Sequence, residues 1–139
     1  MTETIDQHVL EQYSISKKVG QGAYGVVWKA THRQSGDTVA LKKCFDAFRN
    51  NTDSQRTYRE VAYLKAMTGH ENIINIRNVI RAYGDRDLYI TFDYLETDLS
   101  HVIKAKILTV SVFVHQTKHL DDLSSSVLTY LRFLLPLSL

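Results

Sequence analysis

Alternating apolar and polar residues mark three short segments in the first third of the chain. They are residues 13–19, 25–32 and 38–45, and each has the two-residue period of a β-strand. A glycine-rich run, 20–25, separates the first pair, and the turn signal Ser35-Gly36-Asp37 separates the second pair. Because such short connections join neighbouring strands, the pattern predicts a three-stranded meander.

Residues 50–69 change from strand to helix periodicity. Thr52 and Gln55 have the spacing of a capping box, and the periodic run ends at Gly69. The pattern predicts one amphipathic helix. Its apolar positions, about 3.6 residues apart, are Tyr58, Val61, Ala62, Leu64 and Met67.

Two further strand-like segments follow the helix. Residues 73–82 and 88–93 are joined around Gly84-Asp85-Arg86, a composition typical of a hairpin turn. The polar run Glu96-Thr97-Asp98 then introduces a short helix that we expect to reach about Lys104. Five strands and one main helix together predict an α+β fold.

The character of the sequence changes after Ile107. Residues 108–114 are uncharged and β-branched, and residues 127–139 are apolar apart from Arg132. Neither run approaches the roughly 18 apolar residues that a membrane-spanning helix needs. We treat 108–139 as a divergent tail of unknown structure and residues 1–12 as an N-terminal extension.

Composition narrows the class of protein. The 139 residues allow one domain at most. The net charge is +2, and charged residues of both signs are spread along the chain, so no basic stripe indicates nucleic-acid binding. Cys44 has no internal disulfide partner and lies in an apolar run, where a small buried hydrophobe is expected. The acidic N-terminus does not resemble a signal peptide. We therefore expect a protein of the cytoplasm or nucleus.

The glycine-rich run has the pattern G-x-G-x-x-G at Gly20, Gly22 and Gly25. Glycines allow backbone amides to approach phosphate oxygens closely. A dinucleotide-binding fold would open a helix at the third glycine, but Val26 and Val27 continue a strand. A Walker A loop is excluded because Val26 stands where its lysine should be. A plain hairpin explains Gly25 but not three glycines so close together.

The next strand carries Val-Ala-Leu-Lys at 39–42. Strand alternation places Ala40 and Lys42 on one face, opposite Leu41 and Lys43, and we expect Lys43 to face solvent. A small alanine beside a lysine suits an adenine ring with phosphates alongside.

These motifs, in this order, resemble the N-terminal lobe of a eukaryotic protein kinase, from about Gln12 to Ile107. Within that family the chain is most similar to mitogen-activated protein kinases, and further to the atypical extracellular-signal-regulated branch. The segments typical of these groups are Gly22–Gly25, Phe45–Asn50, Gln55–Glu60, His70–Ile74, Asp85–Tyr89, Phe92 and Glu96–Leu99. The resemblance implies a kinase-like N-lobe at 13–107: a five-stranded antiparallel sheet, one main helix, the hinge and the start of the next helix.

The resemblance also implies a set of ATP contacts. Val19, Val27 and Ala40 would cover the adenine, and Phe92 would close the back of the pocket. Backbone groups of Asp93 and Leu95 would bind the adenine edge, and Asp98 the ribose. The loop would cover the phosphates, while Lys42, paired with Glu60, would contact them. The loop residues are Gly20, Gln21, Gly22, Ala23, Tyr24 and Gly25.

The motifs for phosphoryl transfer itself, H-R-D-x-x-x-x-N and D-F-G, do not occur in these residues. We therefore predict no catalytic residue here, no protein-held metal, and Mg²⁺ binding only through ATP. His115 and His119 are spaced four apart but lack a third ligand. The function implied is the ATP-binding lobe of a Ser/Thr kinase, inactive alone, with protein substrates in the full enzyme. The alternative is a non-catalytic regulatory fragment that binds kinase-pathway partners through its apolar tail.

Overall fold

The computed structural model describes residues 3–98, 101, 104 and 105. The chain divides into two compact units, residues 1–94 and 95–139. The predicted tail at 108–139, with His115 and His119, lies outside the described residues. No helix in the described part of the chain is long and apolar enough to cross a bilayer.

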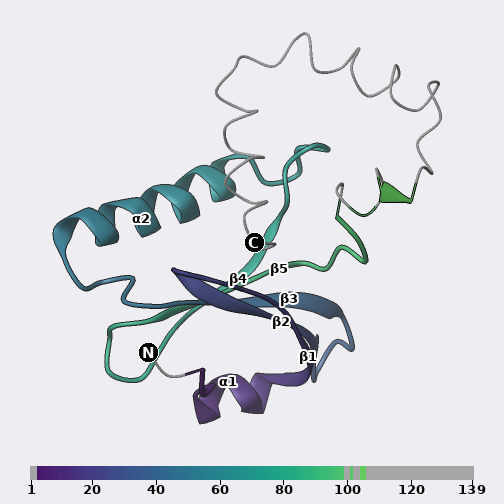
Figure 1. The fold of residues 1–139 in the computed structure, drawn as a ribbon, viewed down its shortest axis with the longest axis horizontal. Coiled ribbons are helices and arrows are strands. Elements are labelled where there is room, and N and C mark those ends of the chain that lie inside the picture. Colours follow the sequence, from purple (N-terminus) through teal and green to yellow (C-terminus); the bar gives the residue numbers. More distant parts are fainter. Residues whose placement is uncertain (1–2, 99–100, 102–103, 106–139) are drawn as a thin grey trace, which may run out of the picture. The chain divides into compact units, whose positions relative to one another are not determined.

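The first unit is a five-stranded antiparallel sheet with two helices (Figure 1). Its strand order is β1-β2-β3-β5-β4. The predicted α+β fold is therefore confirmed, and β2 and β5 have the bounds expected from the sequence. The elements are α1 (Gln7–Gln12), β1 (Tyr13–Gly22), β2 (Gly25–His32), β3 (Thr38–Cys44), α2 (Asn51–Ala66), β4 (Ile76–Arg81) and β5 (Leu88–Asp93).

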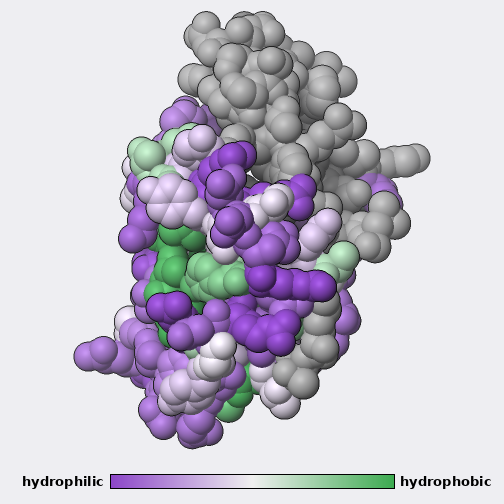
Figure 2. Space-filling model, turned by 90° about the vertical axis from the view of Figure 1, so that its left-hand side faces the viewer, coloured by the Kyte–Doolittle hydropathy of each residue, from purple (hydrophilic) through white to green (hydrophobic). Residues whose placement is uncertain are grey.

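The two helices lie on opposite sides of the sheet (Figure 1). On the α1 face, Val9 packs in an apolar cluster with Leu41 and Tyr89, and all three are fully buried. Helix α1 was not predicted, because its six residues are too few to establish a helical period. The coloured surface seen in Figure 2 is mostly hydrophilic, with a hydrophobic patch on its left-hand part.

Helix α2 begins differently from the prediction. Its N-cap is Asn50, whose Oδ1 accepts from the Asp53 amide at 2.9 Å while its Nδ2 donates to the Asp53 carboxylate at 2.7 Å. Thr52 therefore lies inside the helix, and the predicted Thr52–Gln55 capping box is wrong. The reason is that Asn50 already satisfies the free amide of the first turn.

The predicted apolar stripe of α2 is confirmed with one exception. Leu64 is buried and Val61, Ala62 and Met67 are half-buried, but Tyr58 is 73% exposed. The side turned inward also carries Thr57 and Glu60, both half-buried. A charged residue thus occupies the middle of the inward-facing side, which periodicity of apolar residues alone could not show.

The expectation that Lys43 faces solvent is wrong. Lys43 is only 2% exposed on the α1 face of β3. Its Nζ donates to the Thr4 carbonyl at 2.8 Å and lies 3.3 Å from the Asp87 carboxylate. These partners come from distant parts of the chain, so the sequence near Lys43 does not predict them. Buried amines require such compensation.

Cys44 ends β3 and is buried, as predicted for a small hydrophobe. Burial raises the pKa of its thiol to about 11, although the charge of Lys42 opposes this effect. The thiol is therefore protonated at neutral pH, and a protonated thiol is a poor nucleophile.

Candidate nucleotide-binding site

Lys42 and Glu60 form an ion pair on the α2 face of the sheet. Lys42 projects from β3, Glu60 from the inward side of α2, and Nζ lies 2.7 Å from Oε1. The two side chains keep 21% and 30% of their surface exposed. An amine held this way stays charged and reachable, so it can accept a second anionic partner.

The pKa of Lys42 reflects opposing effects. Burial by itself lowers this pKa. Three effects outweigh burial and raise the pKa of Lys42 above its usual value. They are the negative charge of Cys44, once its thiol has ionised, the charge of Glu60, and the hydrogen bond to Glu60. Lys42 is consequently an ammonium ion throughout the physiological pH range.

Strand register builds an apolar surface beside this pair. Val27 and Ile90 are the cross-strand partners of Lys42, on β2 and β5. Ala40 pairs with Phe92 in the same way. Because directly opposite residues of antiparallel strands share a face, all five side chains lie on the α2 face. An apolar floor beside a charged amine suits a flat ring carrying an anionic group.

Ile90 is a member of this surface that the sequence analysis missed. It is fully buried, directly across from Lys42. Its place depends on the pairing of β3 with β5, whose residues lie far apart in the sequence. No local pattern in the sequence carries that register.

The glycine-rich run forms the β1–β2 hairpin. Gly22 pairs with Gly25, which leaves Ala23 and Tyr24 in the turn, and Tyr24 is 73% exposed. The Phe45 amide donates to the Tyr24 carbonyl at 2.9 Å, which ties the tip of this hairpin to the end of β3.

Gly25 has a structural reason to be glycine. A Cβ at this position would lie 2.2 Å from the Lys43 carbonyl oxygen, well inside van der Waals contact. The close approach brings the glycine-rich hairpin against β3, the strand that carries Lys42.

The remaining loop residues are more open. Val19 is 44% exposed and lies at an irregularity in the β1–β2 register, between Lys18 and Gly20. Gln21 is exposed, and its side-chain carbonyl accepts from Lys18 Nζ at 2.6 Å.

Asp93 ends β5. Its amide donates to the Asn75 carbonyl at 3.3 Å, and its carboxylate accepts from Arg77 and from Asn75. The hydrogen bond from Arg77 holds the pKa of Asp93 below its usual value, and the partial burial of the carboxylate opposes this effect. These contacts anchor the strand end from which the chain leaves the sheet.

The protein kinase domain family matches residues 13–134, more than half of the chain. The chain belongs to the protein kinase family. Extracellular signal-regulated kinase 2 of Dictyostelium discoideum is 57% identical over 107 residues, which make up 77% of this chain and 29% of that protein. Mitogen-activated protein kinase 15 of Caenorhabditis elegans is 53% identical over 104 residues, 75% of this chain and 22% of that protein.

Extracellular signal-regulated kinase 7 of Drosophila melanogaster is 49% identical over 102 residues, 73% of this chain and 11% of that protein. The resemblance to the N-terminal lobe of a MAP-kinase-type Ser/Thr kinase is therefore confirmed. The chain spans less than a third of the length of each of these three relatives.

Leu95 and Asp98 belong to the second unit, which is described by itself. Leu95 is 67% exposed. Asp98 Oδ1 accepts from the His101 amide at 2.7 Å and lies 3.2 Å from His101 Nδ1. The amide hydrogen bond lowers the pKa of Asp98, so this residue caps the turn that follows it.

Among the described residues, no group of three His, Cys, Asp or Glu side chains could hold a metal ion. The structure brings together Val27, Ala40, Lys42, Glu60 and Phe92 with the glycine-rich hairpin, all within the first unit. Leu95 and Asp98 are not placed relative to this group.

Proposed function

We propose that the α2 face of this lobe binds ATP as the N-terminal part of a Ser/Thr protein kinase. The observation that carries the proposal is the 2.7 Å Lys42–Glu60 ion pair, beside an apolar floor and on the strand that the glycine-rich hairpin contacts. Lys42 would neutralise the α- and β-phosphates, and Glu60 would hold the amine in place.

The other site residues take roles around this pair. Val19, Val27 and Ala40 cover the adenine, Phe92 closes the back, and backbone groups of Asp93 and Leu95 bind the adenine edge. Asp98 has one carboxylate oxygen engaged by His101, and its second oxygen reaches the ribose. The backbone of residues 20–25 covers the phosphates.

Mg²⁺ would enter with the nucleotide and neutralise phosphate charge. The complete enzyme would transfer the γ-phosphoryl group to Ser or Thr of protein substrates, in the cytoplasm or nucleus, and residues outside this chain would complete the catalytic site. The three relatives are named as kinases, which supports this proposal over the regulatory-fragment alternative.

The test is an NMR titration of the full 139-residue chain with Mg-ATP. We expect weak binding, with a Kd on the order of 1 mM, and shifts confined to the hairpin, β3 and β5. Lys42→Met should weaken binding about tenfold or more, because it removes a charge-assisted phosphate contact.

The matched control is Lys17→Met, which removes an exposed lysine from β1. It should leave the affinity unchanged. Shifts that are absent at saturating ATP, or equal in the two variants, would refute an ATP site on this face.

A further inference from the structure

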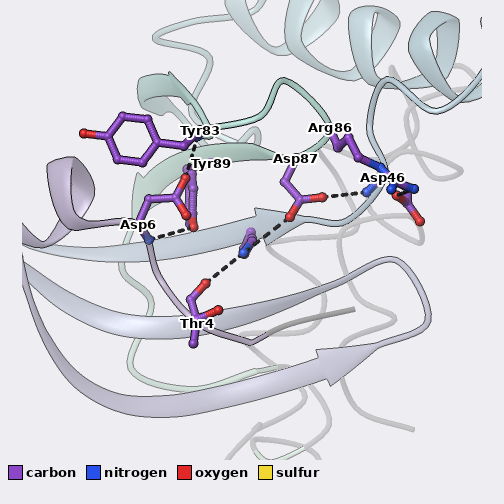
Figure 3. A network of polar contacts seen from close by, with 8 residues as sticks. Thr4, Asp6, Asp46, Tyr83, Arg86, Asp87 and Tyr89 are labelled. Atoms are coloured by element: carbon purple, nitrogen blue, oxygen red, sulfur yellow. Dashed lines mark hydrogen bonds and ion pairs between the residues drawn. The ribbon is translucent and has the colours of Figure 1, made fainter.

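Lys43 is the centre of a polar network on the α1 face, and Figure 3 labels the residues of this network around it. Its side chain is 3% exposed. Besides Thr4 and Asp87, the amine lies 5.4 Å from the centre of the Tyr89 ring. A charge enclosed to this degree is stable only while its partners stay in place.

One arm of the network holds the N-terminal strap, which we define as residues 3–12. Thr4 accepts from Lys43, and the Asp6 amide donates to the Tyr89 hydroxyl at 3.1 Å. The Asp6 carboxylate accepts from the Tyr83 amide at 2.7 Å (Figure 3). The strap is therefore anchored both to β3 and to the β4–β5 hairpin.

The second arm leads toward helix α2. One oxygen of Asp87 faces Lys43, and the other accepts from the Asp46 amide at 2.9 Å (Figure 3). Asp46 has a left-handed backbone with φ of 50°, and Arg86 holds its carboxylate at 2.9 Å. This turn directly follows β3 and leads into α2, the helix that carries Glu60.

We propose that Lys43 is a positioning residue for the Lys42–Glu60 pair, an inference that rests on the proposed nucleotide site. Lys42 is its neighbour on β3 and points to the opposite face, so β3 cannot turn one lysine without turning the other. Through Asp87 and Asp46, the same amine fixes the start of the connection to Glu60. The N-terminal strap thereby becomes part of the support for the phosphate-binding lysine.

The test compares Asp87→Asn with Asp85→Asn, the same substitution two residues away. Asp85 pairs with Arg81 on the surface, where both side chains are well exposed, and it lies outside the network. The readout is competitive acetylation of Lys42 as a function of pH, followed by mass spectrometry, together with the Mg-ATP titration.

Asp87→Asn should raise the acetylation rate of Lys42 by about threefold or more and shift the pH profile of this acetylation downward, because a loosened Glu60 no longer favours the charged amine of Lys42. The same variant should weaken ATP binding. Asp85→Asn should change none of these. A purely structural role would lower stability without moving the pH profile of Lys42.

Lys43→Met gives a second variant, in which an unbranched apolar side chain occupies the space of the lysine stem while Asp87 loses its ammonium partner. It should free the strap in amide exchange and raise Lys42 acetylation, and Lys43→Arg should restore both in part. If folded Asp87→Asn and Lys43→Met leave the Lys42 profile unchanged, the positioning role is overturned. If the unmodified chain binds no ATP, the nucleotide site fails instead, and the acetylation comparison still decides the role of Lys43.

Discussion

Lys42 and Lys43 are adjacent in the sequence and yet serve opposite faces of β3. The Lys42 side chain is 21% exposed and has a carboxylate partner that is itself partly exposed. The Lys43 side chain is 3% exposed and is held by a carboxylate and a backbone carbonyl. The difference teaches that a lysine available to a ligand keeps a path to solvent, whereas an enclosed lysine holds chain segments together.

The two faces differ in the same way as the two lysines. On the α1 face, Val9, Leu41 and Tyr89 form a closed apolar cluster around the polar network. On the α2 face, the apolar floor ends at the partly exposed Lys42–Glu60 pair. The first face therefore contributes mostly to stability and the second leaves a polar group accessible.

The largest expected effect comes from removing each lysine in turn. Lys43→Ala should lower the free energy of unfolding by about 3 kcal/mol, because it removes one partner of an enclosed ion pair. Lys42→Ala should change it by less than about 1 kcal/mol, since its pair is partly exposed and solvent-screened. Urea denaturation followed by circular dichroism measures both.

The two variants control for each other, because they make the same substitution at neighbouring positions of one strand. Equal losses of stability would break the comparison between the faces. A larger loss for Lys42→Ala would reverse it and make the α2-face pair the structural one.

The contrast between these lysines also marks the limit of what the sequence predicts. Strand alternation separated Lys42 from Lys43, and Glu60, which the order of motifs indicated as the partner of Lys42, lies 2.7 Å from it. The burial of Lys43 could not be predicted, because Thr4 and Asp87 reach it only once the sheet has formed. The hydrophobic period of a segment predicts its secondary structure, whereas contacts between residues far apart in the sequence depend on the fold.

The same limit explains the other differences. Helix α1 is short and Val9 is its one buried residue, so its place on the sheet comes from tertiary packing. The strand predicted at 73–82 is confined to β4, Ile76–Arg81, because the residues before it lead out of the helix through turns. The position of Ile90 beside Lys42 follows from strand pairing alone.

A smaller effect is expected at Gly25, where the hairpin of the nucleotide face meets the backbone of Lys43. Gly25→Ala should destabilise the lobe by about 1–3 kcal/mol, because the new Cβ forces β2 and β3 apart. Amide exchange should accelerate at Lys43 and Cys44 in particular, and ATP-induced shifts should weaken.

Gly36→Ala is the control for Gly25→Ala. A Cβ at Gly36 would meet nothing within 4 Å, but its φ of 77° disfavours alanine. Gly36→Ala should lower the free energy of unfolding by about 1 kcal/mol through backbone strain alone, and it should leave amide exchange in β3 unchanged. Similar exchange patterns in both variants would show that the close approach at Gly25 does not matter.

The smallest expected effect concerns the exposed ion pair between Asp93 and Arg77, whose side chains are 31% and 55% exposed. The pKa of Asp93 is lowered in the folded state, chiefly by the hydrogen bond from Arg77. Its contribution to stability is therefore complete above the unfolded pKa of about 3.9 and is lost as the pH falls through the lower folded value. The pair lies at the end of β5, where the chain leaves the sheet.

Unfolding of the chain and of Asp93→Asn should be compared from neutral to acid pH. The variant should be less stable at neutral pH, and the difference should shrink as the carboxylate of the unmodified chain becomes protonated. Added salt should reduce the neutral-pH difference, because this pair is exposed to screening, and should affect the enclosed Lys43–Asp87 pair less. A difference that persists unchanged into acid would assign the role of Asp93 to its shape and its contact with Asn75 rather than to its charge.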